Sequence, residues 1–220
     1  MTGDSLRPKG RVTKLVPKAV EAGYLRATDP LVRGLLRAGI TPNSITTIGA
    51  LVILASAVAY GTGWIRLGGW LILVSGIVDT LDGQVARQGA RTTRFGAFYD
   101  STLDRVGDGA TFIGIASYLL LAPDIRWRFG AVIACMVGVL AALVVSYMRA
   151  RAEGLGLECK VGIAQRAERI LLLGLPTALL GAGPDGLLLT GIVVVLTLLS
   201  VITVGQRFVY VHRITAGDAG

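Results

Sequence analysis

Long apolar stretches recur along almost the whole chain, separated by short polar segments. Six of them are long enough, or nearly so, to cross a hydrocarbon core about 30 Å thick. They run over Ile45–Tyr60, Leu67–Ala86, Phe95–Leu121, Phe129–Ala150, Ile170–Ala182 and Leu187–Val204. Because lipid offers the backbone no hydrogen-bond partner, stretches of this length cross a membrane as α-helices. Residues 1–220 are therefore predicted to form a single all-α integral membrane domain, with a six-helix transmembrane bundle over residues 43–211.

The fifth stretch is too short to cross the membrane as written. It has to extend back past Arg169 and Arg166, which places these two cations at the interface or beside a water-filled cavity. The first stretch begins just after Thr41-Pro42-Asn43, where either Thr41 or Asn43 can cap the helix. The mean hydropathy of +0.65 is well above that of a soluble domain and supports this membrane assignment.

Lysine and arginine are concentrated in alternate segments. The rich segments contain Arg7, Lys9, Arg11, Lys14, Lys18, Arg26, Arg33 and Arg37; Arg87, Arg91 and Arg94; Arg149, Arg151, Lys160, Arg166 and Arg169; and Arg207 and Arg213. The poor segments contain Arg66, Arg126 and Arg128. With six spans, all rich segments fall on one side, which the positive-inside rule makes cytoplasmic. We therefore expect a multi-pass protein of the cell membrane with both termini in the cytoplasm, and the net charge of +8 reflects topology and membrane lipid rather than nucleic acid.

Residues 1–40 are expected to form a cytoplasmic or interfacial N-terminal segment, and they include one amphipathic stretch. Asp29 and Pro30 are typical of a helix start, and Gly39 is typical of a helix end. Leucines follow one side of this helix, while Arg33 and Arg37 project from another. This pattern favours an interfacial amphipathic helix in the headgroup plane, with an ordinary cytoplasmic cap helix as the alternative.

Four aspartates, Asp79, Asp82, Asp100 and Asp104, lie close together in a chain that is only 16% charged. They border apolar stretches, where an ionisable group is costly and indicates a functional site. Helical periodicity places the first pair on one face and the second pair on another, and the short connection over residues 88–92 turns the two faces toward each other. Hard oxygen ligands of this kind favour Mg²⁺ or Mn²⁺.

Ion pairing is the alternative interpretation of these acids. Three arginines close to them in the sequence could neutralise them without a metal: Arg87, Arg91 and Arg94. A further acid one turn on, Asp108, is expected to be structural and to pair with Arg105.

The pattern Asp-x-x-Asp-Gly-x-x-Ala-Arg, eight residues, Gly-x-x-x-Asp-x-x-x-Asp begins at Asp79 and ends at Asp104. It resembles the motif of the CDP-alcohol phosphotransferase family at all eight fixed positions. The resemblance implies an enzyme of phospholipid biosynthesis that transfers a phosphatidyl group from CDP-diacylglycerol to the hydroxyl of an acceptor and releases CMP. It also implies two Mg²⁺ or Mn²⁺ ions held by Asp79, Asp82, Asp100 and Asp104, with Asp104 as the catalytic general base.

The same resemblance assigns residues that bind the CDP-lipid and the subunit arrangement. Members of the family are commonly homodimers, so a homodimer is expected here. The positions that match CDP-lipid contacts are Asn43, Thr46, Gly83, Ala86, Arg87 and Thr93.

A cluster of cations in the second half of the chain indicates the acceptor. Its pattern looks like that of the phosphatidylinositol phosphate synthases in this family, whose acceptor is inositol 1-phosphate. Arginine suits such a phosphate because its guanidinium can form paired charge-assisted hydrogen bonds. The resemblance assigns the acceptor phosphate to Ser146, Arg149, Arg151, Arg166 and Arg207.

Three alternatives stay open from the sequence. A phosphatidylglycerophosphate synthase would use glycerol 3-phosphate by the same phosphate recognition. The cations could serve membrane topology alone. A divalent-cation transporter is disfavoured, because its site would lie near the bilayer midplane between repeated halves, and no internal repeat is visible here.

Overall fold

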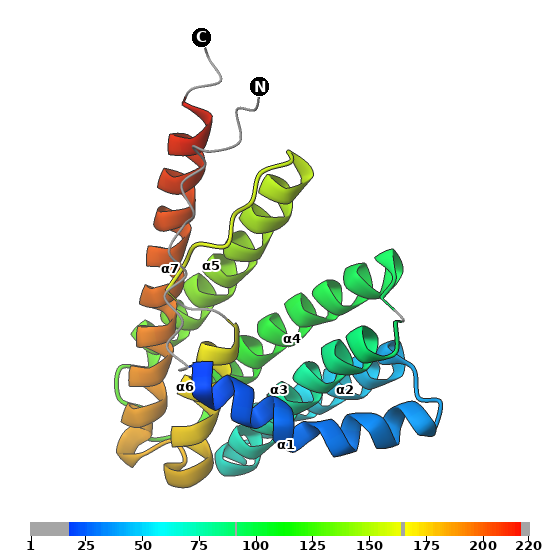
Figure 1. The fold of residues 1–220 in the computed structure, drawn as a ribbon. Helices are drawn as coiled ribbons and strands as arrows, with labels where there is room; N and C mark the ends of the chain where they lie inside the picture. Colours follow the sequence, from blue (N-terminus) through cyan, green and yellow to red (C-terminus); the bar gives the residue numbers. More distant parts are fainter. Residues whose placement is uncertain (1–17, 91, 164–165, 217–220) are drawn as a thin grey trace.

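The computed structural model describes residues 18–90, 92–163 and 166–216, and every regular element within these ranges is a helix (Figure 1). The prediction of an all-α fold is confirmed. The helices are α1 (Lys18–Arg37), α2 (Pro42–Gly61), α3 (Ile65–Gln88), α4 (Arg94–Leu121), α5 (Arg128–Gly154), α6 (Arg166–Leu180), the 3₁₀ helix η1 (Pro184–Gly186) and α7 (Leu187–Thr215).

Threonine side chains cap the two helices that lead into the site. Thr41 Oγ1 accepts a hydrogen bond from the Ser44 amide at 3.2 Å at the start of α2. Thr93 Oγ1 accepts one from the Gly96 amide at 2.9 Å at the start of α4. Of the two caps considered for the first span, Thr41 is therefore the cap, and Asn43 lies in the first turn. Each cap satisfies an amide that the helix itself leaves without a partner.

The prediction that the N-terminal helix starts at Asp29 and Pro30 is wrong, because α1 already begins at Lys18 and contains Pro30 in its interior. Asp29 forms an ion pair with Arg33 and accepts a hydrogen bond from Gln88 Nε2 at 3.1 Å. The predicted end is confirmed, since Gly39 has a φ of 72° just beyond the helix. Such a left-handed residue stops a helix, and glycine adopts it without steric cost.

Helix α1 packs against the protein through a small apolar cluster. Its Val32 is fully buried and lies in one cluster with Ile45 of α2 and with Leu81 and Val85 of α3. This contact holds α1 beside the end of α3 that carries the aspartates. The position of α1 relative to the headgroup plane stays a prediction.

The last helix is longer than the sequence predicts. Helix α7 does not end at Val204 but continues to Thr215, so Arg207 lies within a helix rather than in a tail. Helix α6 begins at Arg166, as the length of the fifth apolar stretch required. Arg166 and Arg207 thus both lie within helices.

The helices form two groups: α2, α3 and α4 make up one, and α5 and α7 make up the other. Helix α4 contacts α5, and α6 contacts both α3 and α7, so these helices join the two groups. Helices α2, α3 and α4 pack on one another, α6 packs on α3, and α5 packs on α4 and α7 (Figure 1). Glycine permits two of these contacts. A Cβ on Gly114 of α4 would lie 2.1 Å from the Ala57 carbonyl oxygen of α2, and one on Gly69 of α3 would lie 2.3 Å from the Ala178 amide nitrogen of α6. Small residues allow helix backbones to approach this closely, as is common between membrane helices.

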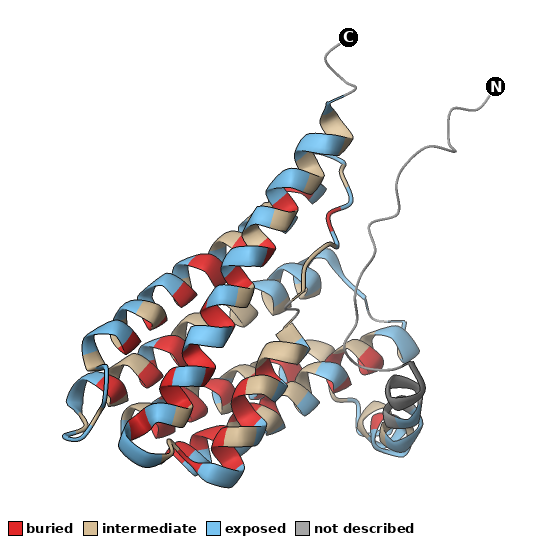
Figure 2. Ribbon diagram, turned by 90° about the vertical axis from the view of Figure 1, so that its left-hand side faces the viewer, coloured by how far each residue is buried: buried red, intermediate tan, exposed pale blue. Residues whose placement is uncertain are grey.

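Three of the described helices are long and apolar enough to cross a membrane: Pro42–Gly61, Arg128–Gly154 and Pro184–Thr215. Helices α3 and α4 carry the aspartates and several arginines, and α6 has only 15 residues. Large apolar side chains such as Leu51, Val58 and Phe129 are exposed on the outer faces, while buried residues face neighbouring helices (Figure 2). Exposed apolar surface on this scale indicates a membrane protein.

We expect Gly114→Ala to weaken the packing of α2 on α4. Its new methyl group would meet a backbone carbonyl that has no rotamer with which to move away. Overpacking typically costs about 1–3 kcal/mol, so thermal unfolding in detergent should shift to a lower temperature. Gly109→Ala in the same helix is the matched control, because a Cβ there meets nothing within 4 Å. Equal unfolding temperatures for the two variants would contradict the contact.

Candidate active site

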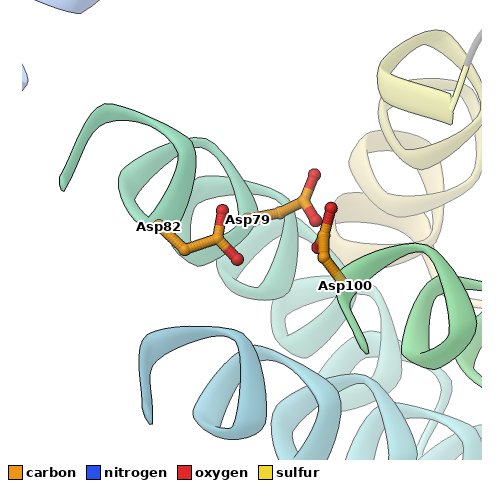
Figure 3. A group of neighbouring side chains, drawn as sticks. All are labelled: Asp79, Asp82 and Asp100. Carbon is orange, nitrogen blue, oxygen red and sulfur yellow. The ribbon is translucent and has the colours of Figure 1, made fainter. Parts of the chain in front are cut away.

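Three aspartates come together between α3 and α4. Asp79 and Asp82 lie one turn apart on α3, and Asp100 lies on the facing turn of α4 (Figure 3). One carboxylate oxygen from each lies within 4.8 Å of the other two. Asp82 is buried at 7% exposure, and the other two are half-buried. The structure thus brings together three of the four aspartates that the sequence predicts to face one another.

The chemistry of this group fits a divalent cation. Asp82 Oδ2 accepts a hydrogen bond from Thr46 Oγ1 at 2.7 Å, but Asp100 Oδ1 is buried and has no hydrogen-bond partner in the described part of the chain. Within that part, no ion pair neutralises Asp79, Asp82 or Asp100. Uncompensated buried carboxylates are costly unless they are paired or coordinate a metal. A buried orphan oxygen beside two further carboxylates is a suitable ligand set for Mg²⁺ or Mn²⁺.

The ion-pair alternative for these three acids is not favoured. Arg87 and Arg94 form no ion pair with Asp79, Asp82 or Asp100 among the described residues, and Arg91 lies outside them. The guanidinium of Arg87 instead lies over Gly83, where a Cβ would come within 3.2 Å of Nη1.

Asp104 lies beside this group but is not part of it. Its Oδ1 forms an ion pair with Arg166 Nη1, and its Oδ2 lies 3.4 Å from Arg105 Nη2. Together with Asp79, Asp82 and Arg166 it lines a small cavity that adjoins the aspartate group. Asp104 therefore stands next to the predicted metal with a guanidinium partner, and its roles as metal ligand and base stay predictions.

A groove of about 190 Å³ adjoins the aspartates at the start of α2 and α4. Every residue predicted to bind the CDP-lipid lines it: Asn43, Thr46, Gly83, Ala86, Arg87 and Thr93. Asp82 and Asp100 form the end of the groove that faces the candidate metal site. A Cβ on Gly96 would lie 3.0 Å from Thr93 Oγ1 and 3.2 Å from Asn43 Oδ1, so this glycine leaves room for two polar groups.

Three groove residues were absent from the sequence prediction: Pro42, Thr92 and Ala97. Pro42 adjoins Asn43 and Thr92 adjoins Thr93, while Ala97 adjoins Gly96 of the aspartate motif. Their position next to these residues in the sequence was therefore the only signal that could have predicted them.

The residues predicted for the acceptor do not all meet. Ser146 and Arg149 lie three residues apart on α5, where the serine hydroxyl donates to the Ala142 carbonyl and Arg149 pairs with Glu153 at 2.8 Å. Arg151 is exposed and forms no ion pair in the described ranges. It lies about 200° around the helix from Arg149. The structure thus places Arg151 on the opposite side of α5.

Arg207 is largely buried, with 9% exposure, and its guanidinium contacts backbone rather than solvent. Its Nε donates to the Val161 carbonyl at 2.9 Å, and its Nη1 donates to the Val145 carbonyl. Arg207 therefore ties α7 to α5 and to the connection between α5 and α6. Cys159 in that connection is fully buried, and burial raises the pKa of its thiol, which keeps it protonated.

Two further arginines belong to this region and were not predicted as site residues. Arg169 Nη2 lies 2.9 Å from Asp108 Oδ2, so Asp108 forms its ion pair with Arg169, while its expected partner Arg105 lies only within electrostatic range of it. Arg105 instead lies on Asp104, within electrostatic range of Arg149 and Arg169. Arg105, Arg166 and Arg169 each have a buried Nε without a hydrogen-bond partner among the described residues. Buried unpaired donors of this kind suit an anion.

Comparisons with known proteins agree with this geometry. Residues 39–211 match the CDP-alcohol phosphatidyltransferase family. A phosphatidylinositol phosphate synthase of Cutibacterium acnes is 38% identical over 201 residues, which cover 87% of this chain and 95% of the relative. An archaetidylinositol phosphate synthase of Methanothermobacter thermautotrophicus is 40% identical over 191 residues, covering 86% and 90%.

Solved structures show the same fold. The Mycobacterium tuberculosis phosphatidylinositol phosphate synthase with CDP-DAG bound superimposes with a TM-score of 0.76 at 34% identity, covering 85% of this chain and 94% of that one. The same synthase in complex with manganese and citrate gives a TM-score of 0.75 at 34% identity, covering 84% and 88%. The family match spans most of the chain and includes all four aspartates of the motif. The chain belongs to the CDP-alcohol phosphatidyltransferase family.

Proposed function

We propose that this protein transfers a phosphatidyl group from CDP-diacylglycerol to a hydroxyl of inositol 1-phosphate, giving phosphatidylinositol phosphate and CMP. The observation that carries the proposal is the group of three unpaired aspartates at the end of a groove lined by every predicted CDP-lipid residue. The names of the relatives support the acceptor, since the two relatives described above are synthases of inositol phosphate lipids. They do not favour glycerol 3-phosphate or a transporter.

The reaction exchanges one P–O bond for another. The acceptor hydroxyl oxygen attacks the phosphorus that carries the diacylglycerol, the bond from this phosphorus to CMP breaks, and the hydroxyl proton passes to Asp104. Metal ions bound by Asp79, Asp82 and Asp100 would supply charge neutralisation for the pyrophosphate and the departing CMP. Asp104 lies beside this group rather than in it, which suits a residue that accepts a proton.

The acceptor phosphate is assigned to the cationic end of the bundle. We place it near Arg149 and Arg166, with Arg105 and Arg169 as additional cations. Ser146, Arg151 and Arg207 remain assigned by resemblance. The structure supports Arg207 chiefly as a residue that fixes the backbone around this pocket, because two of its nitrogens already donate to carbonyl oxygens.

The membrane arrangement follows from the same assignment. Helices α2 to α7 would cross the cell membrane six times, with α1 at the interface and both termini in the cytoplasm. The distribution of cations supports this orientation, since it places the cation-rich segments and the active site on one side. A homodimer is part of the proposal by family resemblance alone.

We expect Asp100→Asn to abolish transfer and to weaken metal binding. The substitution keeps size but removes a charge from a partly buried group of three carboxylates. Bound Mn²⁺ can be counted by electron paramagnetic resonance, and CMP release can be measured on the same samples. The control is Asp124→Asn in the connection between α4 and α5, outside the aspartate group. Unchanged Mn²⁺ binding by Asp100→Asn would remove the metal site from the proposal.

Arg149→Ala should raise the acceptor KM while leaving the KM for CDP-diacylglycerol nearly unchanged. A hydrogen bond to a charged group is worth about 1.5–3 kcal/mol, which corresponds to roughly 10–150-fold. The assay is CMP release with inositol 1-phosphate, with Arg213→Ala near the end of α7 as the control. Wild-type KM in Arg149→Ala would contradict its contact with the acceptor. The same measurement on Arg151→Ala decides whether that residue, on the opposite side of α5, has any part.

Acceptor identity is tested on the wild-type protein. CMP release should be fast with inositol 1-phosphate and slow with free inositol or serine, because neither of these carries a phosphate for the arginines. Faster release with glycerol 3-phosphate would keep the reaction class but replace the named acceptor.

A further inference from the structure

Asp104 and Arg166 are bound to each other, although the proposed reaction uses them separately. Arg166 Nη1 forms an ion pair with Asp104 Oδ1, and Arg105 Nη2 faces the other oxygen at 3.4 Å. The side chains of Asp104 and Arg166 are mostly buried, with 16% and 18% exposure. Both oxygens of the proposed base therefore face guanidinium groups, in a setting with little access for water.

This pairing bears on the ability of Asp104 to take a proton. A general base needs a free oxygen within about 2.6–3.2 Å of the hydroxyl that it deprotonates. Because Arg166 Nη1 is in contact with Oδ1, a hydroxyl cannot approach that oxygen until Arg166 moves. With Oδ1 paired to Arg166, Asp104 has no free Oδ1 with which to accept a proton.

Arg166 has an alternative anion in the proposed reaction. It occupies the first position of α6, and its Nε is buried without a hydrogen-bond partner among the described residues. Arg169 lies three residues further on the same helix and has an unpartnered buried Nε as well. A dianionic phosphate near these two side chains would accept charge-assisted hydrogen bonds from both, whereas Asp104 offers a single negative charge.

We propose that Arg166 is a specificity-determining residue that makes the availability of Asp104 depend on the acceptor's phosphate. The phosphate competes with Asp104 for the guanidinium of Arg166, and the transfer of Arg166 to the phosphate frees Oδ1 beside the acceptor hydroxyl. The inference rests on the proposed function, since it requires a phosphorylated acceptor and Asp104 as the base.

Two consequences follow for specificity. Without acceptor, Asp104 cannot activate a water molecule, so CDP-diacylglycerol is protected from hydrolysis to phosphatidic acid and CMP. In that side reaction, the water oxygen would attack the same phosphorus, the bond to CMP would break, and Asp104 would take a water proton. An acceptor without phosphate would also fail to release Asp104, so the phosphate should contribute to kcat as well as to KM.

The first test measures CMP and phosphatidic acid released from CDP-diacylglycerol and Mg²⁺ without acceptor. Arg166→Gln should hydrolyse the lipid roughly tenfold faster than wild type or more, because general-base assistance is typically worth about 10²–10⁴ in rate. Its transfer to inositol 1-phosphate should fall. Arg166→Lys, which retains a cation for Asp104, should hydrolyse the lipid more slowly than Arg166→Gln. Arg126→Gln in the connection between α4 and α5 is the control that should hydrolyse at the wild-type rate. Hydrolysis by Arg166→Gln at or below the wild-type rate would overturn the inference.

A second measurement needs no variant and so does not depend on the folding of Arg166→Gln. Inorganic phosphate, added to wild type without acceptor, should accelerate lipid hydrolysis and should inhibit transfer when inositol 1-phosphate is present. Phosphate that inhibits transfer without accelerating hydrolysis would also contradict the inference. Failure of the proposed function would give a different result. In that case, no acceptor would stimulate CMP release from the wild-type protein.

Discussion

The site depends on the placement of three like charges close together, with arginines within electrostatic range but not in ion-pair contact. Asp79, Asp82 and Asp100 converge at the ends of two otherwise apolar helices, and no arginine in the described part of the chain pairs with them. Removing a carboxylate from water is costly unless a cation compensates it. Because three carboxylates share one small space, a divalent ion compensates them better than any single side chain could. The bound metal is therefore expected to stabilise the contact between α3 and α4 as well as to serve the chemistry.

The remaining acids of α4 differ from the three grouped aspartates because they form ion pairs. This difference divides the site into two halves. Asp104 and Asp108 each have a guanidinium partner, Arg166 and Arg169, and both partners come from α6. The half toward α2 and α3 therefore suits metal ions and the pyrophosphate of a nucleotide lipid. The half toward α5, α6 and α7 carries the excess of cations and suits the phosphate of an acceptor. Asp104 stands at the boundary, which is where the two substrates have to meet.

Close helix packing holds these halves together. Gly69 brings the backbone of α3 against α6, and Gly114 brings α4 against α2. Without a hydrophobic driving force between helices in lipid, such contacts rely on tight van der Waals packing. Arg207 adds a polar connection, because it joins α7 to a carbonyl of α5 and to the connection that leads into α6. The position of Arg166 thus depends on residues that touch no substrate.

The sequence alone determined the all-helical class, the approximate limits of α2 to α6 and the grouping of Asp79, Asp82 and Asp100. Each of these depends on short-range order: apolar length sets the helices, and a spacing of three or four residues sets which aspartates share a face. Much of the lining of the groove beside the aspartates was likewise predictable, because most of its residues lie within the motif from Asp79 to Asp104 and the others lie at the start of α2. Only the tertiary structure decided that Asp104 pairs with Arg166, that Asp108 pairs with Arg169 rather than Arg105, and that Arg207 binds backbone carbonyls. These contacts join residues 46 to 62 positions apart, whose approach depends on how whole helices pack, and no local pattern in the sequence encodes it.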